Sequence, residues 1–98
     1  MLDFYIISDE TNSNAKNVQK QTWIKSMEYD VFDYLKSINI IEERFDDYST
    51  FRWSAAFVKQ KINLIENSKY RTDKNVIELL EILNDANRQQ CGLIVFGD

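Results

Sequence analysis

The chain has 98 residues, of which 44% are apolar and 13% aromatic, and its formal net charge is −4. This length suits one domain, 1–98, and the apolar content is enough for a core, which excludes a disordered chain. No uninterrupted apolar run is longer than four residues, the length of Phe4–Ile7 and of Leu93–Phe96. A membrane span needs about 20 such residues and the core of a signal peptide about 7–15, so we expect a cytoplasmic protein.

The first predicted element is a strand over residues 2–8, which is apolar at both even and odd positions. Residues 91–97 have the same character, so the two runs predict interior strands that meet at the centre of one sheet. The polar stretch 9–21 predicts a surface loop. Residues 22–25 then predict a short third strand at the edge of the sheet.

Three helices are predicted between these strands. The first extends over 26–38, with a serine at its N-terminal cap. The second begins after a cap at Ser49 and includes Phe51 in its apolar stripe, and the third begins after Thr72 or Asp73. The predicted fold class is therefore α+β, with a small two- or three-stranded sheet formed by the N- and C-terminal strands and packed against about three helices.

Several residue types needed for common enzyme chemistry are missing or scarce. The chain has no histidine, one cysteine (Cys91) and two glycines (Gly92 and Gly97). It therefore lacks Ser-His-Asp and Cys-His catalysis, histidine-ligated zinc, thiolate metal clusters and a phosphate-binding glycine loop. We predict a non-enzymatic protein that needs no cofactor and no metal, with Cys91 as a buried, small apolar residue.

Acidic side chains are concentrated between residues 26 and 50. This segment holds seven acidic and two basic side chains, a net charge of −5, whereas the residues from 51 onward sum to +1. A negative surface repels nucleic-acid phosphate and anionic lipid, and it attracts basic proteins. We therefore expect a protein partner with a basic surface, and neither nucleic acid nor a membrane.

Residues 42–53 interleave carboxylates with aromatic rings, and two interpretations are open. In the first, Phe45 and Phe51 staple the start of the second helix and the acids stabilise its dipole. In the second, the segment is a recognition surface with Tyr48 and Trp53 as anchors and the acids as attractors of a basic partner. The candidate partner-binding residues are Glu42, Glu43, Asp46, Asp47, Tyr48 and Trp53.

Three blocks of the sequence carry a resemblance to a known group of proteins. They are Asp-Phe-Tyr-Ile-Ile-Ser at 3–8, Asp-Asp-Tyr-Ser-Thr-Phe-Arg-Trp-Ser at 46–54, and Cys-Gly-Leu-Ile-Val-Phe-Gly-Asp at 91–98. Together with its size and acidity, these blocks make the chain resemble small acidic bacterial immunity proteins of polymorphic toxin systems. The resemblance implies a cytoplasmic inhibitor that binds a secreted toxin domain tightly, often a basic nuclease.

Three functions remain open from the sequence. The leading hypothesis is an immunity or inhibitor protein that blocks a basic partner through its acidic, aromatic surface. The second is an adaptor or homo-oligomeric module that pairs with a copy of itself through the edge of its sheet. For the chain as a whole we expect a monomer or weak dimer. The third is a small enzyme that uses carboxylates such as the neighbouring pairs at 42–43 and 46–47, although neighbouring acids on a surface turn are typical of a solvated patch.

Overall fold

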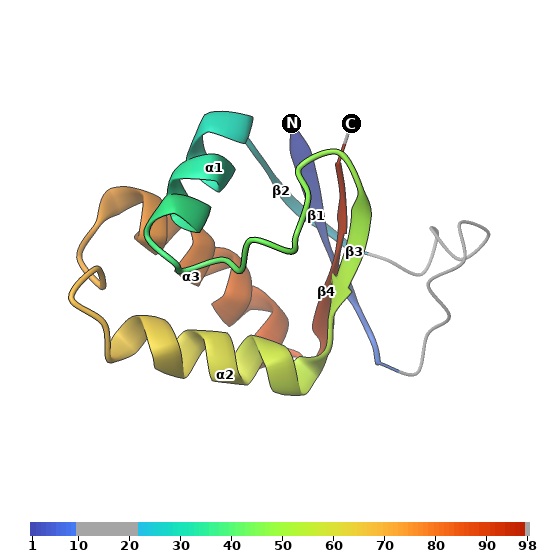
Figure 1. Ribbon diagram of the computed structural model, residues 1–98. Coiled ribbons are helices and arrows are strands. Elements are labelled where there is room, and N and C mark those ends of the chain that lie inside the picture. Colours follow the sequence, from blue (N-terminus) through green and yellow to red (C-terminus); the bar gives the residue numbers. More distant parts are fainter. Residues whose placement is uncertain (10–21, 98) are drawn as a thin grey trace.

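The computed structural model describes residues 1–9 and 22–97. Within these ranges the elements are β1 (Leu2–Ile7), β2 (Thr22–Met27), α1 (Tyr29–Ser37), β3 (Thr50–Trp53), α2 (Ala55–Glu66), α3 (Lys74–Arg88) and β4 (Gly92–Phe96). The strands form one antiparallel sheet in the order β2-β1-β4-β3, and all three helices lie on one side of it (Figure 1). The α+β class predicted from the sequence is confirmed. None of the helices in the described ranges is long and apolar enough to cross a membrane.

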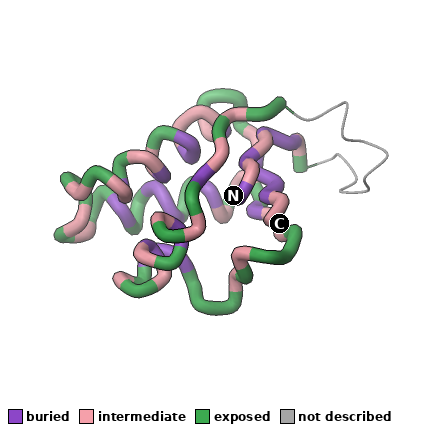
Figure 2. The backbone as a smooth tube through the Cα atoms, turned by 90° about the horizontal axis from the view of Figure 1, so that it is seen from above, coloured by how far each residue is buried: buried purple, intermediate pink, exposed green. Residues whose placement is uncertain are grey.

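The first and last strands lie side by side at the centre of the sheet, as predicted. Asp3 of β1 pairs with Phe96 of β4, and Ile7 pairs with Gly92. Each of these strands has a neighbour on both edges, which leaves little of its backbone exposed. Figure 2 shows the buried positions gathered in the strands and on the inward sides of the helices, whereas the connections between elements are largely exposed.

The sheet has four strands rather than the two or three predicted, because part of the expected second helix is strand β3. Phe51 and Trp53 are two residues apart and both pack against the core. Side chains two residues apart share a face in a strand but not in a helix. The prediction that Ser49 caps a helix containing Phe51 was therefore wrong. The cap of α2 is Ser54, whose hydroxyl oxygen accepts a hydrogen bond from the backbone N–H of Phe57 at 3.1 Å.

The predicted edge strand at 22–25 is confirmed as part of β2, but β2 continues as far as Met27. The first helix consequently begins at Tyr29, and the predicted helix cap at Ser26 is wrong. Ser26 pairs with Asp3 of β1, and its hydroxyl donates a hydrogen bond to the Asp3 carboxylate. Pairing with the neighbouring strand thus outweighs the tendency of serine to start a helix.

The pairing of β2 with β1 is irregular. Phe4 pairs with Lys25 and Tyr5 pairs with Trp23, so Ile24 is an extra residue on β2 and forms a β-bulge. A bulge and an exposed lysine on an edge strand both hinder pairing with the strand of another molecule. The remaining residues of the predicted surface loop, 10–21, lie outside the described residues.

Helix α3 begins where the sequence predicted. The carboxylate of Asp73 accepts hydrogen bonds from the backbone N–H groups of Asn75 at 2.8 Å and Val76 at 3.3 Å. The hydroxyl of Tyr34, on α1, donates to the same carboxylate at 2.5 Å. This bond is the main cause that lowers the pKa of Asp73 below its ordinary value and raises the pKa of Tyr34. It ties α1 to the start of α3.

The two glycines of the chain stand at the two ends of β4, where the backbone passes very close to other backbone. A Cβ atom on Gly92 would lie 2.1 Å from the carbonyl oxygen of Trp53, and one on Gly97 would lie 2.2 Å from that of Asp47. Gly97 also donates its backbone N–H to the carbonyl oxygen of Ser49 at 3.2 Å. Both glycines are therefore needed for packing.

We expect Gly92→Ala and Gly97→Ala each to destabilise the fold by about 1–3 kcal/mol or more, because the new methyl group overlaps a backbone carbonyl that cannot rotate away. The midpoint of urea unfolding, followed by tryptophan fluorescence, measures the effect. An unchanged midpoint for either variant would show that β4 can move away from the backbone it touches at that glycine without loss, contrary to the packing described above.

Candidate functional site

The candidate residues lie on or next to the loop that joins α1 to β3, residues 38–49, called the acidic loop below. The loop leaves the end of α1 and crosses to the edge strand β3 (Figure 1). Five of the six candidate residues belong to this loop. The sixth, Trp53, belongs to β3.

Lys61, on α2, holds the first part of the acidic loop. Its ammonium group donates hydrogen bonds to the carbonyl oxygen of Ile40 at 2.9 Å and to Oε1 of Glu42 at 2.5 Å. It also lies 5.0 Å from the centroid of the Phe57 ring. The Lys61 side chain is 3% exposed and that of Glu42 is 42% exposed. The cation of this ion pair is therefore buried, and its carboxylate faces solvent.

Lys36, on α1, holds the second part of the loop through the same three kinds of contact. Its ammonium group donates a hydrogen bond to the carbonyl oxygen of Phe45 at 3.0 Å and lies 3.9 Å from Oδ1 of Asp47. It also lies 5.5 Å from the centroid of the Phe32 ring. A carbonyl, a carboxylate and an aromatic face all favour a cation. Two lysines from two helices thus fix the loop at two points.

The end of the acidic loop is shaped by Asp46. Its carboxylate accepts hydrogen bonds from the backbone N–H of Tyr48 at 2.9 Å and from the hydroxyl of Ser49 at 3.3 Å, which forms an Asx turn. Tyr48 is 67% exposed, more than any other large apolar or aromatic side chain of the described residues. Its ring lies 5.4 Å, centroid to centroid, from the ring of Tyr29 on α1. Tyr48 is therefore exposed and yet held in place.

Asp33, on α1, lies close to Asp47 of the loop. The neighbouring Asp47 carboxylate, through side-chain hydrogen bonding and then through its negative charge, is the main cause that raises the pKa of Asp33. Lys36 acts in the opposite direction and lowers this pKa. The negative charges of Asp33 and Asp47 therefore oppose each other, and the charge of Lys36 counteracts this repulsion.

Glu43 differs from the other acids of the loop. It is exposed, and it makes no ion pair or hydrogen bond through its side chain with the residues that the structure describes. Its carboxylate therefore contributes to the negative surface without shaping the loop, which makes it the most useful position for testing that surface.

Trp53 does not belong to the predicted binding surface. Its side chain is only 1% exposed, and ring centroids of Phe4, Phe45, Phe51 and Phe57 surround it at 5.4 to 6.4 Å. Strand β3 turns the indole toward the helices, so the predicted anchor is a core residue. The indole N–H has no hydrogen-bond partner among the described residues.

The residues that hold the acidic loop were missed by the sequence analysis. They are Tyr29, Lys36 and Lys61, and Asp33, whose charge opposes that of Asp47, was missed as well. Of these, Lys61 had a detectable signal, because it follows Phe57 by four residues and precedes Leu64 by three, the spacing of one helix face. The other contacts join residues whose approach depends on the path of the loop, which no local pattern specifies.

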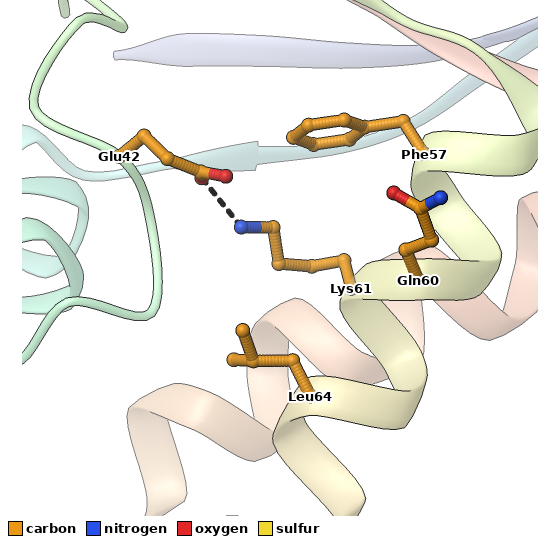
Figure 3. A pocket seen from close by; sticks show the side chains of 5 residues that line it. All are labelled: Glu42, Phe57, Gln60, Lys61 and Leu64. Atoms are coloured by element: carbon orange, nitrogen blue, oxygen red, sulfur yellow. Dashed lines mark hydrogen bonds and ion pairs between the residues drawn. The ribbon is translucent and has the colours of Figure 1, made fainter.

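A pocket of about 110 Å³ opens between α2 and the acidic loop. Its lining residues are Glu42, Phe57, Gln60, Lys61 and Leu64 (Figure 3). The pocket is well below the range of roughly 300–1,000 Å³ that is common for sites of small molecules and cofactors. It has room for one side chain.

Two further predictions concern reactive groups. Cys91, predicted to be buried, is half-buried, and its thiol donates a weak hydrogen bond to the carbonyl oxygen of Gln89 at 3.3 Å. In the described part of the chain, no group of three or more His, Cys, Asp or Glu side chains is arranged to hold a metal ion.

Comparison with known proteins does not assign the chain to a family. No protein-family model, no curated protein and no solved structure matches it. The resemblance to immunity proteins therefore rests on the size, the acidity and the three blocks of the sequence, and the functional argument depends on the acidic loop itself.

We expect Lys61→Met to loosen the acidic loop while the sheet remains intact. The variant removes the donor to the Ile40 carbonyl and the partner of Glu42, and it should destabilise the fold by about 1–3 kcal/mol. Amide hydrogen exchange measures the effect, and the Phe45 N–H should exchange faster because its bond to the Glu42 carbonyl lies within the released loop. The matched control is Lys59→Met, an exposed lysine of the same helix. Equal protection of the loop in both variants would contradict the role of Lys61.

We expect Asp33→Asn to raise the thermal stability at pH 7, because it removes one of two repelling carboxylates. A raised pKa in the folded state means that the folded protein binds a proton more readily than the unfolded chain. The stabilising contribution of Asp33 is therefore present below its unfolded pKa of 3.8 and is lost as the pH rises through the folded pKa. The difference in melting temperature between Asp33→Asn and the unaltered chain should therefore shrink as the pH falls from the folded pKa toward 3.8. Thermal melts from pH 3 to pH 7 measure it, with Glu81→Gln as an exposed control; a pH-independent difference would contradict the coupling.

Proposed function

We propose that the chain is a non-enzymatic, cytoplasmic protein-binding domain that inhibits a partner with a basic surface, in the manner of an immunity protein that blocks a toxin domain. The observation that carries the proposal is Tyr48, an exposed aromatic side chain held in place in the middle of an acidic surface. Exposed, ordered tyrosines are frequent anchors of protein interfaces.

The fixed conformation of the acidic loop supports binding. Association costs free energy whenever a side chain or loop must be ordered in the complex. Here the contacts of Lys36, Lys61 and Asp46 order the loop before any partner arrives. A partner therefore meets Tyr48 and its neighbouring carboxylates in a single arrangement.

The charges of this surface support a basic partner. Glu43 is unpaired among the described residues, Glu42 directs its carboxylate toward solvent, and Asp33 is held next to Asp47. A cation from a partner would relieve the repulsion between the two aspartates, which favours the complex over the free protein. Negative potential over a surface also speeds the approach of a basic protein.

Inhibition would follow from occupation of the partner's basic site. A site that binds an anionic substrate such as nucleic acid is lined by arginine and lysine, and an acidic surface of complementary shape competes for the same cations. The mechanism needs no chemical step in this chain. The acidic loop would act by steric and electrostatic blockade, with Tyr48 as its apolar anchor.

The proposal predicts that Glu43→Lys slows association with the partner several-fold at low salt, and that Tyr48→Ala weakens affinity at least about tenfold. Neither side chain contributes to the core. The protein encoded beside the gene for this chain is a suitable first candidate partner. Surface plasmon resonance at several salt concentrations gives the rate constants, and an activity assay of the partner with and without one equivalent of this chain gives the inhibition.

The control for this experiment is Lys74→Met, an exposed residue at the start of α3 and far along the chain from the acidic loop. It should bind and inhibit as the unaltered chain does. If Glu43→Lys and Tyr48→Ala also bind and inhibit as the unaltered chain does, the acidic loop is not the interface and the proposal fails.

A further inference from the structure

We infer that the pocket between α2 and the acidic loop accepts one arginine side chain of the protein partner. The pocket is lined by Glu42, Phe57, Gln60, Lys61 and Leu64 (Figure 3). The inference rests on the proposed function for the existence of a basic protein partner. It adds the kind of side chain that is recognised and the place where it is recognised.

The size of the pocket limits its occupant. A closed cavity of about 150 Å³ holds one benzene molecule, so a pocket of about 110 Å³ holds a single side chain. Its mouth is flanked by Leu64, which is 47% exposed although it is apolar. An occupant with an apolar stem would cover this leucine and remove its surface from water.

The exposed charge at the pocket is the carboxylate of Glu42. Lys61 is buried behind Glu42 and donates to Oε1 of that residue. Among the described residues no donor is bonded to Oε2 of Glu42, so this oxygen can accept a further hydrogen bond. Because Lys61 is buried and Glu42 is 42% exposed, the exposed end of this ion pair is the negative one. Glu43, which is exposed and follows Glu42 in the chain, adds a further negative charge to the acidic loop.

The arrangement of the walls favours a guanidinium over an ammonium group. Figure 3 shows Glu42 and Gln60 on opposite sides of the pocket, with Phe57 and Leu64 along the other two. The planar fork of arginine offers several donors, which suit both the Glu42 carboxylate and the Gln60 amide oxygen, whereas lysine presents a point charge. A guanidinium also stacks on an aromatic ring, which Phe57 provides, and it is more weakly hydrated than an ammonium.

The test uses three blocked amino acids as probes: the N-acetyl methylamides of arginine, lysine and norleucine. Each is titrated into the ¹⁵N-labelled protein at low salt while the backbone amide shifts are followed by NMR. We expect the arginine probe to shift the amides of Glu42, Phe57 and Lys61 with a millimolar dissociation constant, and to bind about fivefold more tightly than the lysine probe. Equal binding of the lysine or norleucine probe, or no localised shift with arginine, would overturn the inference.

A matched pair of variants localises the binding. Gln60→Lys places a positive charge on the rim and removes the amide acceptor, and it should weaken the arginine probe about fivefold or more. Asn63→Lys adds the same charge to the same exposed helix surface outside the pocket lining, and it should leave the affinity within about twofold. Both positions are exposed, so both variants should fold. An unchanged affinity in Gln60→Lys would place the probe elsewhere.

The same variants separate this inference from the proposed function once a partner is in hand. If Gln60→Lys binds the partner normally while Glu43→Lys and Tyr48→Ala do not, the pocket takes no part and the acidic surface still does. Loss of partner binding in Gln60→Lys but not in Asn63→Lys supports the pocket. The probe titration needs no partner, so its result stands even if the proposed function fails.

Discussion

The close approach of β4 to neighbouring backbone is the constraint on which the rest of the structure depends. At Gly92 the strand touches the carbonyl of Trp53, where β3 ends and α2 is about to begin. At Gly97 it touches the carbonyl of Asp47, where the acidic loop ends. One strand therefore sets both ends of β3, the starting point of α2 and the exit of the loop. A side chain at either glycine would separate these segments.

The acidic loop is then fixed by charge rather than by apolar burial. Burying an ammonium group costs several kcal/mol unless hydrogen bonds and an opposite charge replace its water. Lys61 finds both on the loop, since the Ile40 carbonyl and the Glu42 carboxylate lie within hydrogen-bond distance. A loop that moved away would leave the cation buried without partners. The burial of Lys61 thus raises the free energy of other conformations of the loop. Apolar contacts alone would distinguish less strongly between these conformations.

The sequence predicted the elements whose pattern is local and missed those that depend on pairing. Helix α3 was found because Asp73 caps a long amphipathic stripe, and the central strands because both of their faces are apolar. Strand β3 was missed because Phe51 also fits a helical spacing with Ala55, and only the neighbouring β4 decides between the two. The same ambiguity misplaced Trp53, whose direction follows from β3. Five of the six candidate residues nevertheless lie together on the acidic loop, since they are close in sequence.

Counting charges along the sequence describes the acidic loop incompletely. The net charge of −5 between residues 26 and 50 includes Glu42, whose cation lies outside that segment on α2, and Asp47, whose cation lies inside it on α1. Coulomb energies fall with distance and rise with burial, so a carboxylate backed by a buried lysine still presents its free oxygen to solvent. What a partner meets is therefore decided by which end of each ion pair is exposed. At Glu42 that end is the carboxylate, and for this reason the surface is acidic there although the charge is paired.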